Sequence, residues 1–366
     1  MVRLVAVAAF AGIGSLGGAR GPDEQGFLQN GHRLAADFGA LGTFPHSLVN
    51  QIQTWVVAVQ VWIFGQGLGD IPVRVVGVGI AVAAIPLVAA AVYDLAGARA
   101  AGLAAWLLAL EPSNVFFSGI VHKESLALLG EGLVLLGAVR MYQARDLRAG
   151  ALLVGGVGLT ALVRPYVGAA LAAAAVLVTC HAALRRVGPS RRRAPALVAA
   201  AAVGAGVALA LYPSPSNALD RLQYSQDANA SDASNLRLAR VDVSTPQAVA
   251  VALPRRSFDL LARPYPWQVE SLSQRLGVLG SLAAWLLIAL VLFLIVRRPR
   301  DALEVFPLFY VLLGLVAAYA LSTGNAGTGF RYRTHILVVL IAVLCSLLPK
   351  EVLERASAYV RSVSRR

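Results

Sequence analysis

Several ionisable residues stand within stretches that are otherwise apolar. Glu111 ends one apolar run, His122, Lys123 and Glu124 open the next, and Glu131 follows Glu124 by seven residues. Seven residues make two turns of an α-helix, so the last two glutamates would share a face. Because ionisable groups are costly in an apolar environment, they often mark a site or a pathway. We expect a polar cavity lined by Glu111, His122, Glu124 and Glu131, with Lys123 placed to bind a phosphate.

Each of these residues also has a purely structural interpretation. His122 or Lys123 could simply neutralise Glu124, and Glu131 could be a protonated carboxyl that makes one hydrogen bond. Arg164 precedes a proline, which predicts a break between two helices. Its guanidinium could extend to the lipid headgroups, or it could bind a phosphate in the same cavity.

A second group of acids lies in the stretch 21–27, Gly-Pro-Asp-Glu-Gln-Gly-Phe. Adjacent carboxylates next to a membrane could act as a general base or hold a divalent cation such as Mg²⁺ or Mn²⁺. Acidic residues are also common in the first turn of a helix, where they balance the helix dipole. Asp23 and Glu24 are therefore candidate catalytic residues and candidate metal ligands.

The third group is the stretch 322–335, Ser-Thr-Gly-Asn-Ala-Gly-Thr-Gly-Phe-Arg-Tyr-Arg-Thr-His. Glycine lets a backbone approach a ligand closely, and arginine presents forked donors that match a phosphate. The pattern predicts a loop in which Asn325 faces the cavity and both Arg331 and Arg333 bind a phosphate. The alternative is a flexible hairpin whose arginines bind lipid headgroups.

Composition indicates what kind of protein must position these groups. Of the 366 residues, 58% are hydrophobic and only 14% are charged, and the mean hydropathy is +0.68. Soluble domains are about 25% charged. The composition excludes a water-soluble enzyme and a disordered chain. It predicts an all-α, polytopic integral membrane protein that forms a single membrane domain over residues 1–366.

Hydropathy along the chain predicts about ten transmembrane helices. A helix of about 20 apolar residues crosses the hydrocarbon core of a bilayer. The first predicted span is short and could instead be a signal peptide. The spans are 4–18, 75–93, 100–117, 125–139, 149–163, 165–184, 194–212, 276–296, 305–321 and 334–349.

The distribution of Lys and Arg predicts the orientation in the membrane. With both termini in the cytoplasm, 18 of the 32 basic residues fall on the cytoplasmic side. Residues 19–74 and 213–274 then form two extracytoplasmic loop regions with amphipathic helices, and 350–366 forms a basic cytoplasmic tail. The net charge of +13 reflects this topology, so no nucleic-acid partner is expected. The abundance of Ala, Gly, Leu and Arg favours a bacterial inner membrane.

Parts of the sequence resemble the GT-C superfamily of polytopic glycosyltransferases, especially protein-O-mannosyltransferases and aminoarabinose transferases. The resemblance covers roughly residues 4–184, about half of the chain. It implies a GT-C-like fold, a polyprenyl-phosphate sugar as donor, and an acid of the first outer loop as base or metal ligand, here Asp23 or Glu24. The matching motifs are Asp23-Glu24 with Phe27, Glu111-Pro112-Ser113 with Lys123-Glu124, and Leu162-Val163-Arg164-Pro165-Tyr166.

The expected activity is an inverting transfer of a sugar from that donor to a cell-surface glycan, lipid or protein acceptor on the extracytoplasmic face. The basic residues singled out above would neutralise the donor phosphate, and an acid of the stretch 21–27 would accept the proton of the acceptor hydroxyl. One alternative is an O-antigen-type polysaccharide polymerase or ligase that acts on lipid-linked oligosaccharide and depends on arginines. Another is a transporter or flippase, although the charges crowd into the outer half of the predicted bundle.

Overall fold

The computed structural model describes residues 21–37, 48–65, 67, 70–143, 146–185, 215–231, 236–268 and 272–355. The predicted spans 4–18 and 194–212 lie outside these residues, as does the tail beyond residue 355. Within the described ranges the regular structure is helical, with a single isolated bridge between Arg237 and Asn325.

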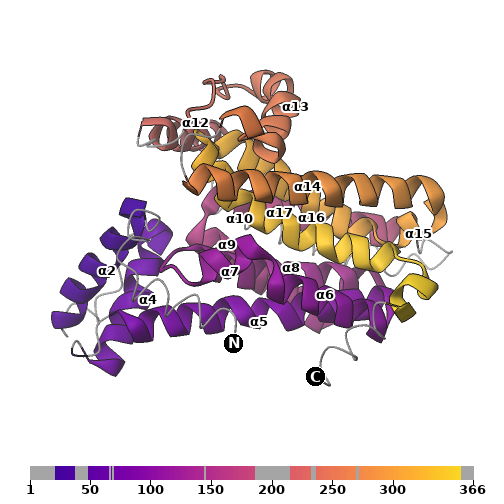
Figure 1. Cartoon of the computed structure of the whole chain (residues 1–366), viewed down its shortest axis with the longest axis horizontal. Helices are drawn as coiled ribbons and strands as arrows, with labels where there is room; N and C mark the ends of the chain where they lie inside the picture. Colours follow the sequence, from indigo (N-terminus) through magenta and orange to yellow (C-terminus); the bar gives the residue numbers. More distant parts are fainter. Residues whose placement is uncertain are drawn as a thin grey trace.

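The long helices run side by side along the longest axis of the molecule (Figure 1). Helix α8 packs against α5 and α9, helix α10 packs against α16, and α14 packs against α17. The elements are α2 (Gly21–Ala36), α4 (Leu48–Phe64), α5 (Ile71–Ala96), α6 (Ala98–Leu110), α7 (Pro112–Ser118), α8 (Glu124–Gln143), α9 (Leu147–Val163), α10 (Pro165–Leu184), α12 (Pro215–Ser231), α13 (Pro246–Ala262), the 3₁₀ turn η4 (Pro266–Gln268), α14 (Leu272–Arg297), α15 (Pro299–Glu304), α16 (Phe306–Ser322) and α17 (Ala326–Leu347).

Several of these helices are long and apolar enough to cross a membrane. Five pass this criterion, namely α5, α8, α10, α14 and α17, and the bent pair α6–α7 makes a sixth if it is counted as one span. Helices α9 and α16 are apolar but shorter, with 17 residues each. The predicted all-helical class and membrane character therefore agree with the structure. The eight predicted spans within the described ranges overlap these helices, but the predicted span 100–117 is bent between α6 and α7, and α9 and α16 are shorter than the criterion requires.

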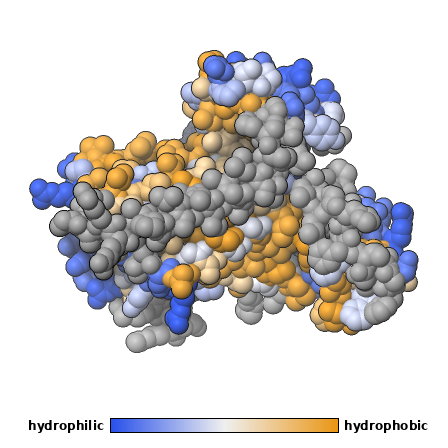
Figure 2. Space-filling view, turned by 180° about the vertical axis from the view of Figure 1, so that it is seen from behind, coloured by the Kyte–Doolittle hydropathy of each residue, from blue (hydrophilic) through white to orange (hydrophobic). Residues whose placement is uncertain are grey.

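On the face seen in Figure 2, hydrophobic residues occupy much of the middle of the bundle, and hydrophilic residues gather mainly toward its ends and over the α12–α13 region. Helix α14 exposes large apolar side chains along its length, including Leu286 and Phe293, which are 61% and 55% exposed. An apolar girdle between polar ends is the surface that a lipid bilayer covers.

Two X-Pro steps break the bundle helices near the candidate site. Glu111 precedes Pro112, where α6 and α7 meet at an angle of 57°. Arg164 precedes Pro165 and has a non-helical backbone, with φ −143° and ψ 87°, between α9 and α10. Proline lacks an amide donor and disfavours helical geometry in the residue before it, so each helix ends there and a new one begins. The break predicted at Arg164 is confirmed.

Helices α8 and α17 form the centre of the bundle, with 83% of the apolar window of each helix buried. Close packing between α8 and α9 depends on glycines. A Cβ at Gly156 would lie 2.6 Å from the backbone oxygen of Gly130. Small residues at such crossings let helix backbones approach, which is a common device in membranes.

The stretch 322–335 differs from the loop that the sequence predicts. Helix α17 already begins at Ala326, because the side chain of Asn325 accepts a hydrogen bond from the Thr328 amide and caps the helix. The interhelical loop is therefore short, and both arginines are helical. Residues 236–238 pair with this loop through the Leu238 amide to the Gly324 oxygen at 3.0 Å, which attaches the α12–α13 region to the α16–α17 turn.

Candidate functional site

One buried carboxylate gathers basic groups from three separate parts of the chain. Glu124, at the start of α8, is 1% exposed. Its Oε1 forms an ion pair with Arg164 from the α9–α10 junction and lies 3.1 Å from Nε of Arg331 on α17. Its Oε2 lies 2.6 Å from Nδ1 of His122. We call His122, Lys123, Glu124, Arg164 and Arg331 the Glu124 cluster.

The imidazole of His122 links both sides of this cluster. Its Nε2 lies 2.6 Å from Nη1 of Arg331, while its Nδ1 faces Glu124. A guanidinium can only donate, so Nε2 accepts from Arg331. Nδ1 lies within hydrogen-bond distance of the Glu124 carboxylate and also of the Lys123 amide nitrogen, which is 3.0 Å away. The local pairing of His122 with Glu124 that the sequence allowed is present.

Lys123 and Arg331 lie nearer the surface than the other members. The side chain of Arg331 is 17% exposed, against 5% for Arg164. The ammonium of Lys123 lies 5.6 Å from the centre of the Phe27 ring on α2. Burial, and then the positive charge of Arg164, lowers the pKa of Lys123 below its usual value. Arg331 is therefore the cluster's guanidinium that an external anion can most readily reach.

Tyrosines cover the inner side of the cluster. The guanidinium carbon of Arg164 lies 4.4 Å from the ring centre of Tyr332 and 5.4 Å from that of Tyr319. The hydroxyl of Tyr332 is 2.9 Å from that of Tyr166. Cation–π contacts of this kind stabilise a guanidinium that has left water. Arg164 is thus held inside the protein, and it does not extend to the lipid headgroups.

Glu131 lies deeper along the same face of α8. Its two oxygens meet the hydroxyl of Tyr319 at 3.0 Å and Nδ1 of His335 at 2.8 Å. All three side chains are at most 1% exposed. The alternative interpretation of Glu131 as a hydrogen-bonded structural group agrees with these contacts, and the partners come from α16 and α17. Tyr319 contacts both Arg164 and Glu131 and so connects this group to the Glu124 cluster.

The first turn of α2 lies against the same region. Oε1 of Glu24 accepts from Nη1 of Arg74 at 2.6 Å and from the Val121 amide at 3.0 Å. Arg74 also donates to the Gly119 oxygen at 3.2 Å. The side chain of Glu24 is 1% exposed and next to the 119–123 turn, so the N-terminal turn of α2 adjoins the Glu124 cluster. The side chain of Asp23 lies outside the described residues.

Of the two candidate metal ligands, only Glu24 has a described side chain, and basic and amide groups bind one of its oxygens. Glu24 already binds a guanidinium and an amide through one oxygen, and a cation at that oxygen would be repelled by Arg74. Among the side chains that the structure describes, no group of three or more His, Cys, Asp or Glu could hold a metal ion.

Arg333 does not join Arg331, although the sequence paired them on one phosphate. Its side chain is fully buried and donates to the Leu260 oxygen at 2.8 Å, to Ser281 Oγ at 2.7 Å and to the Arg263 oxygen. The reason is helical geometry. Residues that are two positions apart in a helix are rotated by about 200° around the helix axis. The two arginines therefore face opposite sides of α17.

Two other expected cavity residues serve as helix caps. Glu111 accepts from the amides of Ser113 and Asn114 at 3.0 and 2.6 Å and so caps α7. Asn325 caps α17 and donates to the Asn229 oxygen. Both lie at the same end of the bundle as the Glu124 cluster, and the bonds described here hold backbone groups.

Sequence reasoning missed several residues that bind Glu24 or Glu131 or that cover the Glu124 cluster. Arg74 ends the predicted loop 19–74, although its charge stands just inside the apolar helix α5. Tyr319 lies in a predicted span, and Tyr332 and His335 lie in the stretch 322–335 without a predicted role of their own. Their positions on α16 and α17 would have been a signal, because polar aromatic groups that face a helix bundle interior usually need a partner.

No family model matches the chain, nor does any curated protein or solved structure.

Proposed function

We propose that this protein is a membrane glycosyltransferase that moves a sugar from a polyprenyl-phosphate donor to a cell-surface glycan, lipid or protein acceptor. The observation that supports it best is the Glu124 cluster. Two guanidiniums and an ammonium from three parts of the chain meet at one end of a membrane bundle, and Arg331 keeps part of its side chain exposed. Guanidinium groups suit a phosphate because they donate through parallel N–H groups.

The proposal extends to topology and location. We place ten spans in a bacterial inner membrane, with both termini in the cytoplasm, as the distribution of basic residues predicts. The Glu124 cluster then faces the outer leaflet. In this leaflet the phosphate of a polyprenyl lipid lies at headgroup depth, beside the polar end of the bundle, while its chain stays among the apolar helices.

In the proposed reaction the acceptor hydroxyl attacks the anomeric carbon of the sugar. The bond from that carbon to the phosphate oxygen breaks, and the phosphate leaves with the electron pair. Arg331 and Lys123 neutralise the charge that develops on the leaving phosphate. Arg164 acts through Glu124 and the tyrosines to hold Arg331 in place. A carboxylate takes the proton of the acceptor hydroxyl, and a single displacement of this kind inverts the anomeric centre.

We assign to Asp23 the role of the base that accepts the proton of the acceptor hydroxyl. Glu24 is a poorer base, because its Oε1 is bound by Arg74 and the Val121 amide, and it is 1% exposed. We infer that Glu24 anchors the first turn of α2 against the 119–123 turn and thereby positions its neighbour.

The test uses purified protein in lipid nanodiscs. Polyprenyl phosphates carrying glucose, galactose, mannose or arabinose are supplied with a glycan and lipid acceptor panel, and released polyprenyl phosphate is measured by mass spectrometry. We expect release with at least one donor, and its loss in Arg331→Gln and Asp23→Asn. Arg99→Gln, in an exposed pair with Glu354 at the opposite end, is the matched control. Full activity in both site variants would refute the proposal.

A second candidate is a polymerase or ligase that acts on lipid-linked oligosaccharide. The occupied state of Glu24 favours it, since an arginine-dependent mechanism needs no base from the first outer loop. Under this candidate, Arg331→Gln abolishes activity whereas Asp23→Asn and Glu24→Gln leave it intact. The nanodisc assay with lipid-linked oligosaccharides as both donor and acceptor separates the two candidates.

A further inference from the structure

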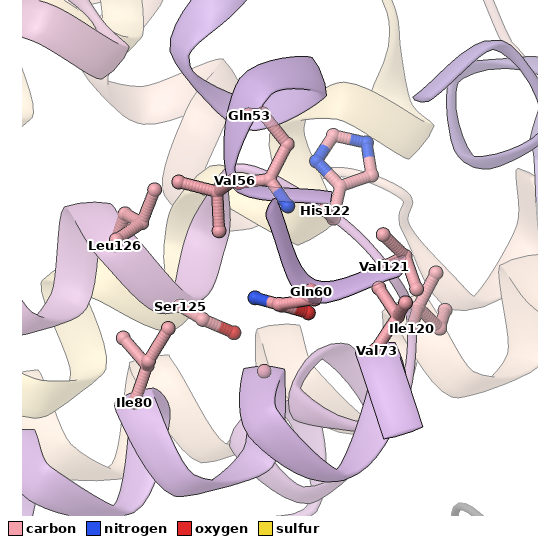
Figure 3. A pocket seen from close by; sticks show the side chains of 11 residues that line it. Gln53, Val56, Gln60, Val73, Ile80, Ile120, Val121, His122, Ser125 and Leu126 are labelled. Carbon is pink, nitrogen blue, oxygen red and sulfur yellow. The ribbon is translucent and has the colours of Figure 1, made fainter. Parts of the chain in front are cut away.

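A small polar cavity lies between α4, α5 and the start of α8, directly beside the Glu124 cluster (Figure 3). Its polar lining comes from Gln53 and Gln60 on α4, from Ser125 on α8 and from His122. In Figure 3 the side chains of Gln60 and Ser125 point toward each other across it. The volume is about 10 Å³, which is room for one water molecule or one hydroxyl group.

The cavity offers hydrogen-bond acceptors that the described residues do not use. Oε1 of Gln53 and Oε1 of Gln60 are buried and have no hydrogen-bond partner within the part of the chain that the structure describes. The two side chains are 7% and 8% exposed. A buried amide oxygen without a partner costs free energy, so it favours a ligand that brings a donor.

The chemistry of the lining selects the ligand group. A phosphate or a carboxylate has no proton to donate to an amide oxygen. Among the described residues, no carboxylate that would attract an amine lines the cavity. A hydroxyl group donates one hydrogen bond and accepts others, for example from Ser125. An uncharged, hydroxyl-bearing ligand therefore fits the cavity better than an anion or a cation.

His122 connects the cavity to the basic groups. It lines the cavity and also lies 2.6 Å from Nη1 of Arg331. A ligand whose phosphate is at Arg331 would thus hold its adjacent sugar within reach of the cavity. We propose that Gln53, Gln60 and Ser125 form a subsite for one hydroxyl of the donor sugar. This inference rests on the proposed function, and it adds that the protein recognises the sugar and not only the lipid phosphate.

The experiment compares the affinity for bare polyprenyl phosphate with that for polyprenyl phosphates carrying glucose, galactose, mannose or arabinose, using protein in nanodiscs. The wild type should bind at least one sugar-bearing lipid more tightly than the bare lipid. Gln53→Met, Gln60→Met and Ser125→Ala should each reduce that difference about fivefold, the effect of one hydrogen bond. Affinity for bare polyprenyl phosphate should stay unchanged. Gln143→Met, at the other end of α8, is the matched control.

The outcomes separate this inference from the function on which it rests. If bare and sugar-bearing lipids both bind through Arg331 but the three subsite variants keep the full sugar preference, the cavity holds only water and the inference is wrong. If no polyprenyl phosphate binds, the proposed function fails and the subsite falls with it. If a glutamine variant also loses bare-lipid affinity, the methionine has disturbed the fold, and the smaller change Ser125→Ala decides.

Discussion

Replacing Glu124 with glutamine tests whether the cluster is an organised ion network. The change keeps the size of the side chain but removes the negative charge between Arg164, Arg331 and His122. The arginines are then left buried around a neutral amide that also points N–H groups at them. Loss of one partner from a buried ion pair is destabilising because the other charge remains uncompensated.

The geometry sets the size of the effect. Nε of Arg331 and Oε1 of Glu124 are 3.1 Å apart. At an effective dielectric constant of about 20, two unit charges at this separation attract by about 5 kcal/mol. The cost of burying the carboxylate offsets part of this attraction. In other proteins, removal of one partner of a buried ion pair typically lowers the free energy of unfolding by about 3–5 kcal/mol. We expect Glu124→Gln to lower the free energy of unfolding by that amount.

The assay is reversible unfolding of purified protein in mixtures of mild detergent and dodecyl sulfate, followed by far-UV circular dichroism. Glu354→Gln is the control, because Glu354 pairs with Arg99 at 2.7 Å while both side chains are 57% exposed. An exposed pair contributes at most about 1 kcal/mol. A double-mutant cycle of Glu124→Gln with Arg331→Gln isolates the pair. Equal losses for Glu124→Gln and Glu354→Gln would refute the network.

Three further variants test other parts of the structure with the same unfolding assay. Gly156→Ala should cost about 1–3 kcal/mol because its Cβ would meet an α8 backbone oxygen at 2.6 Å, whereas Gly155→Ala, with open space around it, should cost nothing. Arg256→Met should raise stability, since burial lowers the pKa of this guanidinium and none of its nitrogens has a hydrogen-bond partner among the described residues, while exposed Arg255→Met should have no effect. Arg333→Met should lower stability by about 2–3 kcal/mol by leaving two backbone oxygens unbonded, without changing affinity for polyprenyl phosphate.

The helices of the bundle could be predicted from sequence because apolar length and proline position are local properties. The span expected at 165–184 matches α10 (Pro165–Leu184), and the break at Arg164 follows from the proline after it. The stretch 322–335 could not be placed in the same way. Its glycines favour a loop, but packing of α17 in the bundle centre stabilises a helix that begins at Ala326, and tertiary contacts override the local preference.

The candidate site was predictable in its residue types but not in its pairings. Glu124 and Arg331 are far apart in sequence, and no periodicity or motif indicates which carboxylate a distant arginine will meet. Once Arg331 is known to be helical, however, the separation from Arg333 follows from the helix period alone. Whether two nearby residues can bind one ligand therefore depends on their secondary structure. The prediction for Arg331 and Arg333 was wrong because it placed them in a loop, whereas both are helical.

The contacts within the Glu124 cluster distinguish residues that position other side chains from the residue that a ligand can reach. Both oxygens of Glu124 and one oxygen of Glu24 are engaged by basic groups or amides, so these buried carboxylates hold other residues in place. The side chain of Arg164 is 5% exposed and packs against two tyrosine rings, whereas that of Arg331 is 17% exposed. A phosphate that approached this end of the bundle would therefore meet Arg331 first, at a guanidinium already oriented by Glu124 and His122. Preorganisation of this kind lowers the cost of stabilising a leaving phosphate, because the donors do not have to reorient during the reaction.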